Sequence, residues 1–387
     1  MSQPNALNPH GLRIVLVLQG GGALGAYQAG VYQAMHEHGL APDWIVGTSI
    51  GAINAALIAG NRKENRLTRI RGFWERVSHP DRIDMEQVSD SQRRSNITFN
   101  TIHAVLSGVP GFFTPRWWNG FAFGWPVAPE AASFYDTAEL RDTLAELVDF
   151  DYLNSPESTR LTINAVNVAS GQLTHFDSRK MRLEPDHVRA SGSLPPAFPP
   201  VRIDGQLYWD GGLYSNTPLE SVLNSLPEGD TLCFMVDLWS SRGPEPMTLD
   251  QVQTRQKDVT YASRSIRHIE DYARMHRLQD KMRDLYERLP PDKRTADDER
   301  DLAELGCEST LHIVRLPYVG RDWHMAAKDV NFSKGSIDWR WNQGYADGMR
   351  AVGDAAWLRK IEEDTAVVVH ELPSIRDRRH NGTRQGP

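Results

Sequence analysis

The sequence predicts an α/β protein in which a central, mostly parallel sheet is flanked by helices. Near the N-terminus, an apolar run of strand length leads through a glycine turn into an alanine-rich helical segment, and the same order then repeats. Two further apolar runs later in the chain are bounded by turn-forming residues. Successive strand-turn-helix units imply parallel strands, because a crossover helix returns the chain to the same end of the sheet.

The first unit begins with the run at residues 12–18, which is too short for a helix of its own and rich in branched residues. These features predict a buried strand. The glycine turn at 19–22 follows, and then an alanine-rich segment at 23–38 with apolar residues at helical spacing. Gly39 and Pro42 end this predicted helix.

The second unit has a short strand at 44–46, a turn at 47–51 and a helix at 52–59. Residues 161–168 and 231–237 are predicted as later strands of the same sheet.

The C-terminal third has a different texture. A long charged run at 252–289 has helical spacing and stops at two prolines, which predicts a solvated helix. A strand at 311–316 and a final helix at about 339–361 follow. We therefore expect four segments: a polar leader at 1–11, the main domain at 12–245, a mostly helical extension at 246–365, and a disordered basic tail at 366–387.

Composition excludes several classes of protein. With 43 Lys+Arg against 50 Asp+Glu the net charge is −7, and an acidic chain without a recognisable module gives no support to nucleic-acid binding. The 40% apolar content is that of a globular chain, which excludes a disordered or collagen-like protein. Cys233 and Cys307 supply neither a disulfide framework nor a metal cluster. No apolar run is long enough to span a membrane, so we expect a cytoplasmic protein.

The spacing of Gly20, Gly22 and Gly25 between a strand and a helix fits a dinucleotide fingerprint, but it is a weak signal alone. A dinucleotide site needs an acidic residue after the next strand, whereas Asp43 comes before it. The end of that strand carries Gly47-Thr48-Ser49-Ile50-Gly51 instead. This order favours an activated serine over a nicotinamide cofactor.

Ser49 is a candidate nucleophile for acyl transfer. A serine on a sharp strand-to-helix turn is exposed above the sheet, and the flanking Gly47 and Gly51 allow tight packing there. The backbone N–H groups of Gly20, Gly21 and Gly22 can approach a substrate oxygen closely, which predicts an oxyanion hole.

A serine needs a base to accept its proton. Asp210 is the first candidate, since it lies in the turn Trp209-Asp210-Gly211-Gly212 after the strand-like run 201–208. A Ser-Asp-His triad is the alternative, because His312 and His324 follow an acidic residue in the order found in α/β-hydrolases.

In this order, the glycine turn, the serine turn and the aspartate turn resemble the patatin-like phospholipases over about residues 12–240. The stretches 190–200 and 216–218 resemble the same family. The resemblance implies a patatin-like three-layer fold and hydrolysis of lipid or other carboxylic esters by a dyad of Ser49 and Asp210, without metal or cofactor. Further motif positions are Gly25, Gly47, Gly51, Gly211 and Gly212.

One position departs from the family pattern, because Leu24 stands where the family often has Arg or Lys. A catalytically weak lipid-binding or protein-binding scaffold on the same fold is therefore a second hypothesis. The part after residue 250 resembles the C-terminal extension of a bacterial subgroup of the family.

Two stretches suggest reversible contact with an anionic membrane surface. One is an aromatic segment, which is either a loop packed on the core or a lid or acyl-chain wall that also touches a lipid surface. It contains Phe112, Phe113, Trp117, Trp118, Phe121, Phe123 and Trp125. A basic stretch, which is either a solvated helix face or a binding site for anionic head groups, contains Arg62, Lys63, Arg66, Arg69, Arg71 and Arg76.

Overall fold

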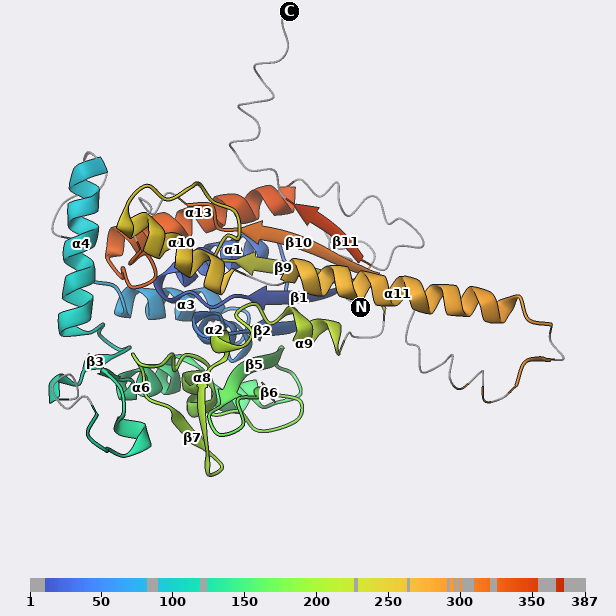
Figure 1. Cartoon of the computed structure of the whole chain (residues 1–387), viewed down its shortest axis with the longest axis horizontal. Helices are drawn as coiled ribbons and strands as arrows, with labels where there is room; N and C mark the ends of the chain where they lie inside the picture. Colours follow the sequence, from blue (N-terminus) through green and yellow to red (C-terminus); the bar gives the residue numbers. More distant parts are fainter. Residues whose placement is uncertain are drawn as a thin grey trace, which may run out of the picture.

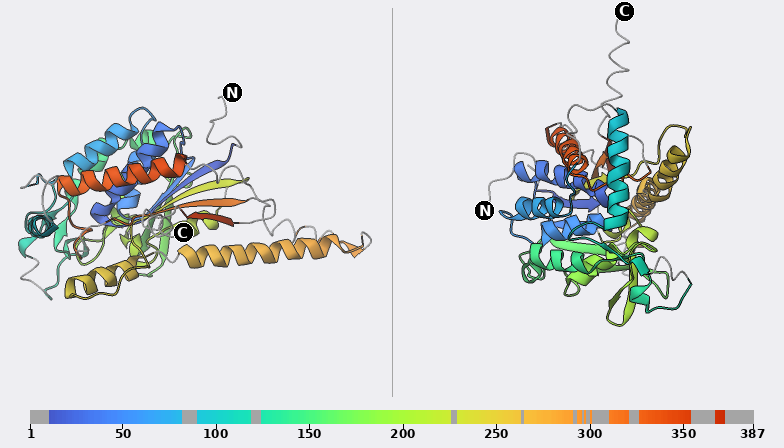
Figure 2. Two further views of the ribbon diagram at one scale, coloured as in Figure 1. Left: turned by 90° about the horizontal axis from the view of Figure 1, so that it is seen from above. Right: turned by 90° about the vertical axis from the view of Figure 1, so that its left-hand side faces the viewer.

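The computed structural model describes residues 11–81, 90–118, 124–225, 229–262, 265–290, 293–295, 297, 300, 310–320, 326–353 and 367–371. Its centre is a mixed, mostly parallel sheet with helices on both faces, which confirms the predicted fold class (Figures 1 and 2). The described strands of this sheet have the order β11-β10-β9-β1-β2-β5-β8-β7, and β6 also pairs with β5.

The predicted strands are present with small shifts at their ends. The parallel strands of the sheet are β1 (Arg13–Leu18), β2 (Trp44–Gly47), β5 (Arg160–Asn167), β9 (Thr231–Asp237), β10 (Leu311–Pro317) and β11 (Val367–Glu371). The antiparallel strands are β6 (Leu173–Asp177), β7 (Val201–Ile203) and β8 (Gln206–Asp210). A separate two-stranded ribbon joins β3 (Thr114–Pro115) to β4 (Tyr135–Asp136).

The helices of the main domain are α1 (Ala26–Glu37), α2 (Ile50–Ala59), α3 (Arg66–Arg76), α4 (Asp90–Ser107), α6 (Ala138–Leu147), α7 (Phe150–Leu153), α8 (Pro185–Ser191) and α9 (Leu219–Leu223). Those of the C-terminal region are α10 (Leu249–Tyr261), α11 (Ser265–Glu287) and α13 (Lys334–Gly353). Short 3-10 turns are η1 (Gly22–Gly25), η2 (Pro129–Ala131) and η3 (Gly211–Leu213).

Alternate residues of β1 face opposite layers, as the two-residue period of a strand requires. Leu16 and Leu18 belong to the larger core with α1, α2 and α13. Val15 and Val17 belong to a smaller core, which includes Ile269 of α11 and apolar residues of α9. Figure 2 shows α1, α3 and α13 on one side of the sheet and α10 and α11 on the other.

The C-terminal region shares the sheet and the core with the rest of the chain. Helix α13 packs closely on α1, where a Cβ added to Gly30 would lie 1.9 Å from the Trp341 carbonyl oxygen, and one on Gly344 would lie 2.0 Å from that of Tyr27. Glycine is required at both positions because the two backbones touch. Strands β10 and β11 extend the sheet beyond β9.

Two predictions of single elements are wrong. Residues 201–208 form a hairpin, because the chain reverses at Asp204 and Gly205, both in the left-handed region with φ of 47° and 80°. The expected helix at 252–289 is divided into α10 and α11. The division follows Tyr261, whose backbone carbonyl accepts side-chain hydrogen bonds from Gln19 and Asn216.

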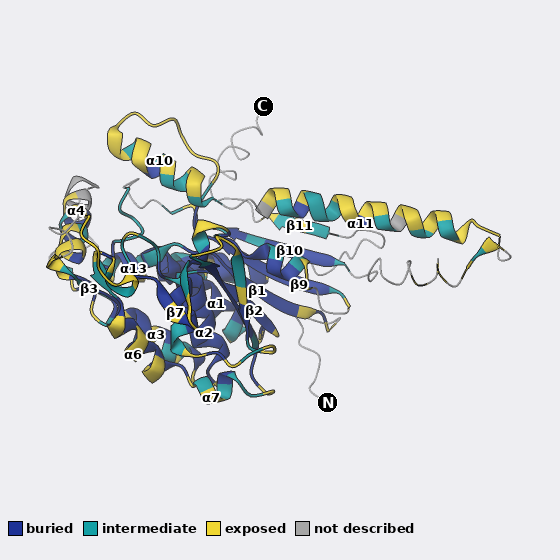
Figure 3. Cartoon of the chain, turned by 60° about the horizontal axis from the view of Figure 1, so that its bottom comes forward, coloured by how far each residue is buried: buried dark blue, intermediate teal, exposed yellow. Residues whose placement is uncertain are grey.

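Helix α11 projects from the body of the protein, and many of its residues are exposed (Figure 3). Of the expected disordered tail, the structure describes residues 367–371. These five residues are ordered as strand β11, because they pair with β10. Three ranges lie outside the described residues: 1–10 in the expected leader, 354–366 from the expected final helix to the start of the tail, and 372–387 in the rest of the tail. Within the described part of the chain, no helix combines the length and apolar character needed to cross a bilayer.

Candidate active site

Ser49 lies on the sharp turn between β2 and α2, as predicted. Its backbone has φ 56° and ψ −124°, a conformation that residues other than glycine seldom adopt. A Cβ on Gly47 would lie 2.4 Å from the Gly51 carbonyl oxygen, and one on Gly51 would lie 2.2 Å from that of Leu18, so both glycines are required by close packing. The Ser49 N–H donates to Ser191 Oγ at 3.0 Å, which fixes the turn.

Asp210 ends strand β8 and faces Ser49. The Ser49 hydroxyl lies close enough to the Asp210 carboxylate to favour its charged form, and the Gly212 N–H donates to Asp210 Oδ1 at 2.7 Å. Gly211 permits this turn, since a Cβ there would lie 2.5 Å from the Asn164 carbonyl oxygen. The structure thus brings together two residues that are 161 positions apart in the sequence (210 − 49).

Burial dominates the electrostatics of Asp210. It raises the pKa of the carboxyl to about 7, although the Gly212 N–H and the Ser49 hydroxyl stabilise the charged form and oppose this effect. A carboxylate with an ordinary pKa near 4 is a weak base. At a pKa of about 7, Asp210 can accept a proton from a serine at neutral pH far more readily.

The glycine turn lies beside Ser49. A Cβ on Gly20 would lie 3.1 Å from Ser49 Cβ, so this face of the turn adjoins the nucleophile. The Gly20 N–H already donates to the Asn216 carbonyl at 3.0 Å, so it is not free to stabilise an oxyanion as we expected. In the described part of the chain, the N–H groups of Gly21 and Gly22 have no acceptor. They are the remaining candidate donors.

Leu24 and Gly25, which follow the glycine turn, have packing roles. Gly25 lies where a Cβ would be 2.5 Å from Ile50 Cγ1, so it allows the start of α1 to approach the start of α2. Leu24 is completely buried in the larger core. The departure from the family pattern therefore places an apolar side chain under the turn.

Sequence reasoning missed the buried side chain that holds the glycine turn in place. Gln19 Nε2 donates to Thr217 Oγ1 at 2.7 Å and to the Tyr261 carbonyl at 3.2 Å. Its Oε1 accepts the backbone N–H groups of Leu238 and Trp239. The local sequence carries no signal for this role, because the four partners are about 200 or more residues away along the chain.

A cavity of about 220 Å³ opens above Ser49 and Asp210. Its walls are mainly apolar and come from both the main domain and the C-terminal region. The apolar residues that line it include Ile50, Ile53, Val105, Phe112, Phe113, Tyr135, Leu194, Ala197, Phe198, Trp239, Tyr261, Val330 and Phe332. Such a cavity suits an acyl chain held next to the nucleophile.

The aromatic segment has a buried part and an exposed part. Phe112 and Phe113 are buried, as the packed-loop interpretation predicted, and they also line the cavity, as an acyl-chain wall would. Trp117, Trp118 and Trp125 are 56%, 86% and 77% exposed, as a surface that contacts lipid would require. Phe121 and Phe123 lie outside the described residues.

Much of the basic stretch is occupied by contacts within the protein. Arg66 is buried and donates to the Asn61 carbonyl at 2.9 Å. Arg76 pairs with Glu146 at 2.7 Å. Arg62 and Arg71 stack over the rings of Tyr152 and Trp341, respectively. These contacts support a structural role for the stretch rather than a dedicated site for head groups.

The geometry gives no support to His312 as the base of a triad. His312 pairs in register with Leu232 and hence with Ile14, whereas the site adjoins Leu18 at the other end of β1. Four residues of strand separate these positions, or about 13 Å. His312 instead stacks on His370 in β11. The second candidate, His324, lies outside the described residues.

Comparison with protein families places this site in a known context. Residues 16–223, more than half of the chain, match the family described as patatin-like phospholipase. Residues 259–364 match a second family, described as patatin phospholipase.

Curated relatives are similar to part of the chain. It is 28% identical over 234 residues to Lysophospholipase NTE1 of Lodderomyces elongisporus, and 31% identical over 241 residues to that of Candida glabrata. It is 29% identical over 214 residues to patatin-like phospholipase domain-containing protein 6 of Mus musculus. The matches cover 60%, 61% and 54% of this chain but only 13%, 11% and 12% of the relatives.

Among solved structures, the chain is similar to VipD of Legionella pneumophila, with a TM-score of 0.40 and 13% identity over 93% of this chain and 72% of VipD.

Proposed function

The chain belongs to the patatin-like phospholipase family, and we propose that it cleaves carboxylic esters of lipids through an acyl-enzyme on Ser49, with Asp210 as the base. The observation that carries this proposal is the placement of the Ser49 hydroxyl beside a buried Asp210 whose pKa is raised to about 7. Both groups lie at an apolar cavity of about 220 Å³.

The reaction would proceed in two stages. Ser49 Oγ attacks the ester carbonyl carbon while its proton passes to Asp210, and the resulting oxyanion accepts hydrogen bonds from the N–H groups of Gly21 and Gly22. Collapse of this intermediate breaks the ester C–O bond, and Asp210 returns the proton to the leaving alcohol. Water then attacks the acyl-enzyme while Asp210 accepts its proton. Collapse of the second intermediate breaks the bond between the acyl group and Ser49 Oγ, and Asp210 returns the proton to Ser49 Oγ as the fatty acid leaves.

Lysophospholipids are the first substrate class to test. The apolar lining of the cavity favours an acyl chain over a polar group, and the cavity is small. Two of the relatives are named lysophospholipases, which supports a substrate with a single acyl chain.

The test is a panel of lysophospholipids, diacyl phospholipids, glycerides and p-nitrophenyl esters, assayed with wild type and Ser49→Ala. We expect hydrolysis of at least one ester class by the wild type and loss of about a thousandfold or more in the variant. Ser78→Ala is a matched control, since that partly exposed hydroxyl lies outside the cavity lining and donates to the Glu75 carbonyl at 2.8 Å. Undiminished turnover by Ser49→Ala would exclude Ser49 as the nucleophile.

A further inference from the structure

The segment that precedes α13 lies directly against the glycine turn. The Asp329 backbone carbonyl accepts the N–H of Ala23 at 2.8 Å. It is so close to the turn that a Cβ on Gly22 would lie 2.3 Å from the Asp329 oxygen. Asp329 also lines the cavity. The backbone of Asp329 therefore fixes where the Gly22–Ala23 peptide can lie.

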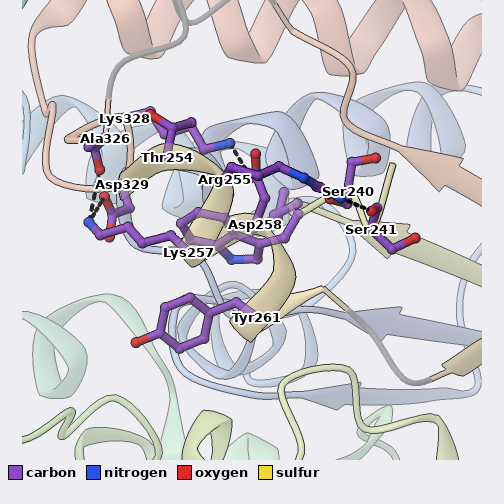
Figure 4. Close-up of polar contacts among 12 residues, drawn as sticks. Ser240, Ser241, Thr254, Arg255, Lys257, Asp258, Tyr261, Ala326, Lys328 and Asp329 are labelled. Atoms are coloured by element: carbon purple, nitrogen blue, oxygen red, sulfur yellow. Dashed lines mark hydrogen bonds and ion pairs between the residues drawn. The ribbon is translucent and has the colours of Figure 1, made fainter. Parts of the chain in front are cut away.

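Whereas the backbone of Asp329 contacts the glycine turn, its side chain is bound by Lys257 of helix α10. Lys257 Nζ donates to both carboxylate oxygens of Asp329, at 2.8 and 3.0 Å, and to the Ala326 carbonyl at 2.9 Å (Figure 4). One ammonium group thus ties two points of the segment to one helix. The two charged side chains are only 34% and 20% exposed, so solvent screens their attraction less than at an open surface.

A second ion pair crosses the first. Lys328 pairs with Asp258 at 2.6 Å, and these side chains are 12% and 16% exposed. The Lys328 ammonium also lies over the ring of Trp239, 4.9 Å from its centre. Trp239 Nε1 in turn donates to the Gly20 carbonyl at 2.8 Å. Both ends of the glycine turn are therefore connected to the crossed ion pairs.

A buried arginine completes the contact from α13. Arg340 donates to the carbonyl of Ala23 at 3.1 Å and to those of Asn331 and Lys328 at 3.0 and 2.8 Å. It therefore joins the exit of the glycine turn to the residues on both sides of Asp329. The N–H and the carbonyl of Ala23 are both bound by groups of the C-terminal region.

We propose that Asp329 and Lys257 are positioning residues that hold the glycine turn in the geometry needed to bind the oxyanion. They act through the Ala23 N–H and Gly22, and neither takes part in the chemistry. The C-terminal region would then be a working part of the active site. This inference rests on the proposed esterase function.

The kinetic test compares Asp329→Asn and Lys257→Met with wild type on a p-nitrophenyl ester. A displaced turn weakens binding of the transition state, so we expect kcat to fall about tenfold while KM changes by less than about twofold. Lys257→Arg keeps the charge and should retain most of the wild-type kcat. Lys334→Met is the matched control, since its ion pair with Asp338 on α13 is exposed, at 58% and 55%.

Thermal unfolding separates positioning from general stabilisation. A purely structural role predicts a lower melting temperature with unchanged kcat in the folded fraction, and that result in both variants would overturn the proposal. If Asp329→Asn does not fold, Lys257→Met carries the test, because its side chain is the more exposed of the pair.

If the wild type hydrolyses no ester, that result refutes the proposed function but not the positioning role. Hydrogen exchange then tests the positioning role without any substrate. The Ala23 amide should be protected in wild type by its bond to Asp329 and should exchange faster in Asp329→Asn and Lys257→Met. Equal exchange at Ala23 in all three proteins would overturn the positioning role.

Discussion

Replacing Asp210 by Asn should make the protein more stable while removing its activity. The folded carboxyl has a pKa of about 7 because it is buried, whereas an exposed Asp titrates at about 3.9. The folded state therefore holds the proton more tightly than the unfolded state. Below about pH 3 both states are protonated and the carboxyl causes no loss of stability. As the pH rises from there towards 7, the folded state loses stability relative to the unfolded state.

The size of this effect follows from the two pKa values. The destabilisation is about 1.5 kcal/mol at pH 5 and reaches about 4 kcal/mol at pH 8, above the folded pKa. Asn has a similar shape and no charge, and its carbonyl oxygen can still accept the Gly212 N–H that now bonds to Asp210 Oδ1. Asp210→Asn should therefore recover much of this free energy at pH 8 and less of it at pH 5.

Urea unfolding followed by circular dichroism at both pH values measures the difference. We expect the advantage of Asp210→Asn over wild type to grow by about 2 to 3 kcal/mol from pH 5 to pH 8. Asp204→Asn is the control, because this residue lies in the exposed hairpin turn. A variant that is no more stable than wild type at pH 8, or whose advantage is independent of pH, would refute the claim that burial raises the pKa of Asp210.

Three further predictions follow from the site. Because Asp210 accepts a proton only when ionised, kcat/KM should rise with pH through about 7 and then level off, as a pH-rate profile would measure. Gly22→Ala should lower the free energy of unfolding by about 2 kcal/mol or more and impair turnover, since φ is 55° and the new Cβ would lie 2.3 Å from a backbone oxygen. Replacing Trp117 and Trp118 by Ala should weaken co-sedimentation with anionic liposomes, because both rings are exposed.

Each of these predictions has a contrary outcome, and the two that use variants also have a control variant. A flat pH-rate profile between pH 5 and 8 would contradict the role of Asp210 as the base. Gly171→Ala has a similar φ of 69° with nothing within 4 Å of the new Cβ, so an equal loss in both glycine variants would remove the steric argument. Met282→Ala with Leu285→Ala removes exposed apolar surface on α11; an equal loss of liposome binding there would show that the tryptophans have no special role.

The sequence was sufficient to predict the parallel sheet and the serine turn because their signals are local. Glycines at 47 and 51 around Ser49 are required by contacts within a few residues or with the neighbouring strand. The Asp204-Gly205 turn is also a local signal, and it was missed because the apolar residues on both sides were assigned to one strand. Strand β8 is the second strand of that hairpin, and Asp210 is its last residue.

The rest of the site depends on contacts between distant parts of the chain. Gln19 reaches Thr217 and Tyr261 across 198 and 242 positions, and the Asp329 carbonyl meets the glycine turn after more than 300 residues. Such pairs leave no periodicity or turn signal in a single sequence. They form only when distant segments come together in the fold, as α10 and the segment before α13 do at the glycine turn.

Covalent labelling with a fluorophosphonate tests the central claim most directly, because this probe reacts with an activated serine and needs no knowledge of the substrate. Mass spectrometry of the labelled protein should locate one adduct on the peptide that contains Ser49. Labelling should be lost in Ser49→Ala and strongly slowed in Asp210→Asn. An adduct on another serine, or equal labelling of wild type and Ser49→Ala, would contradict the assignment of Ser49 as the nucleophile.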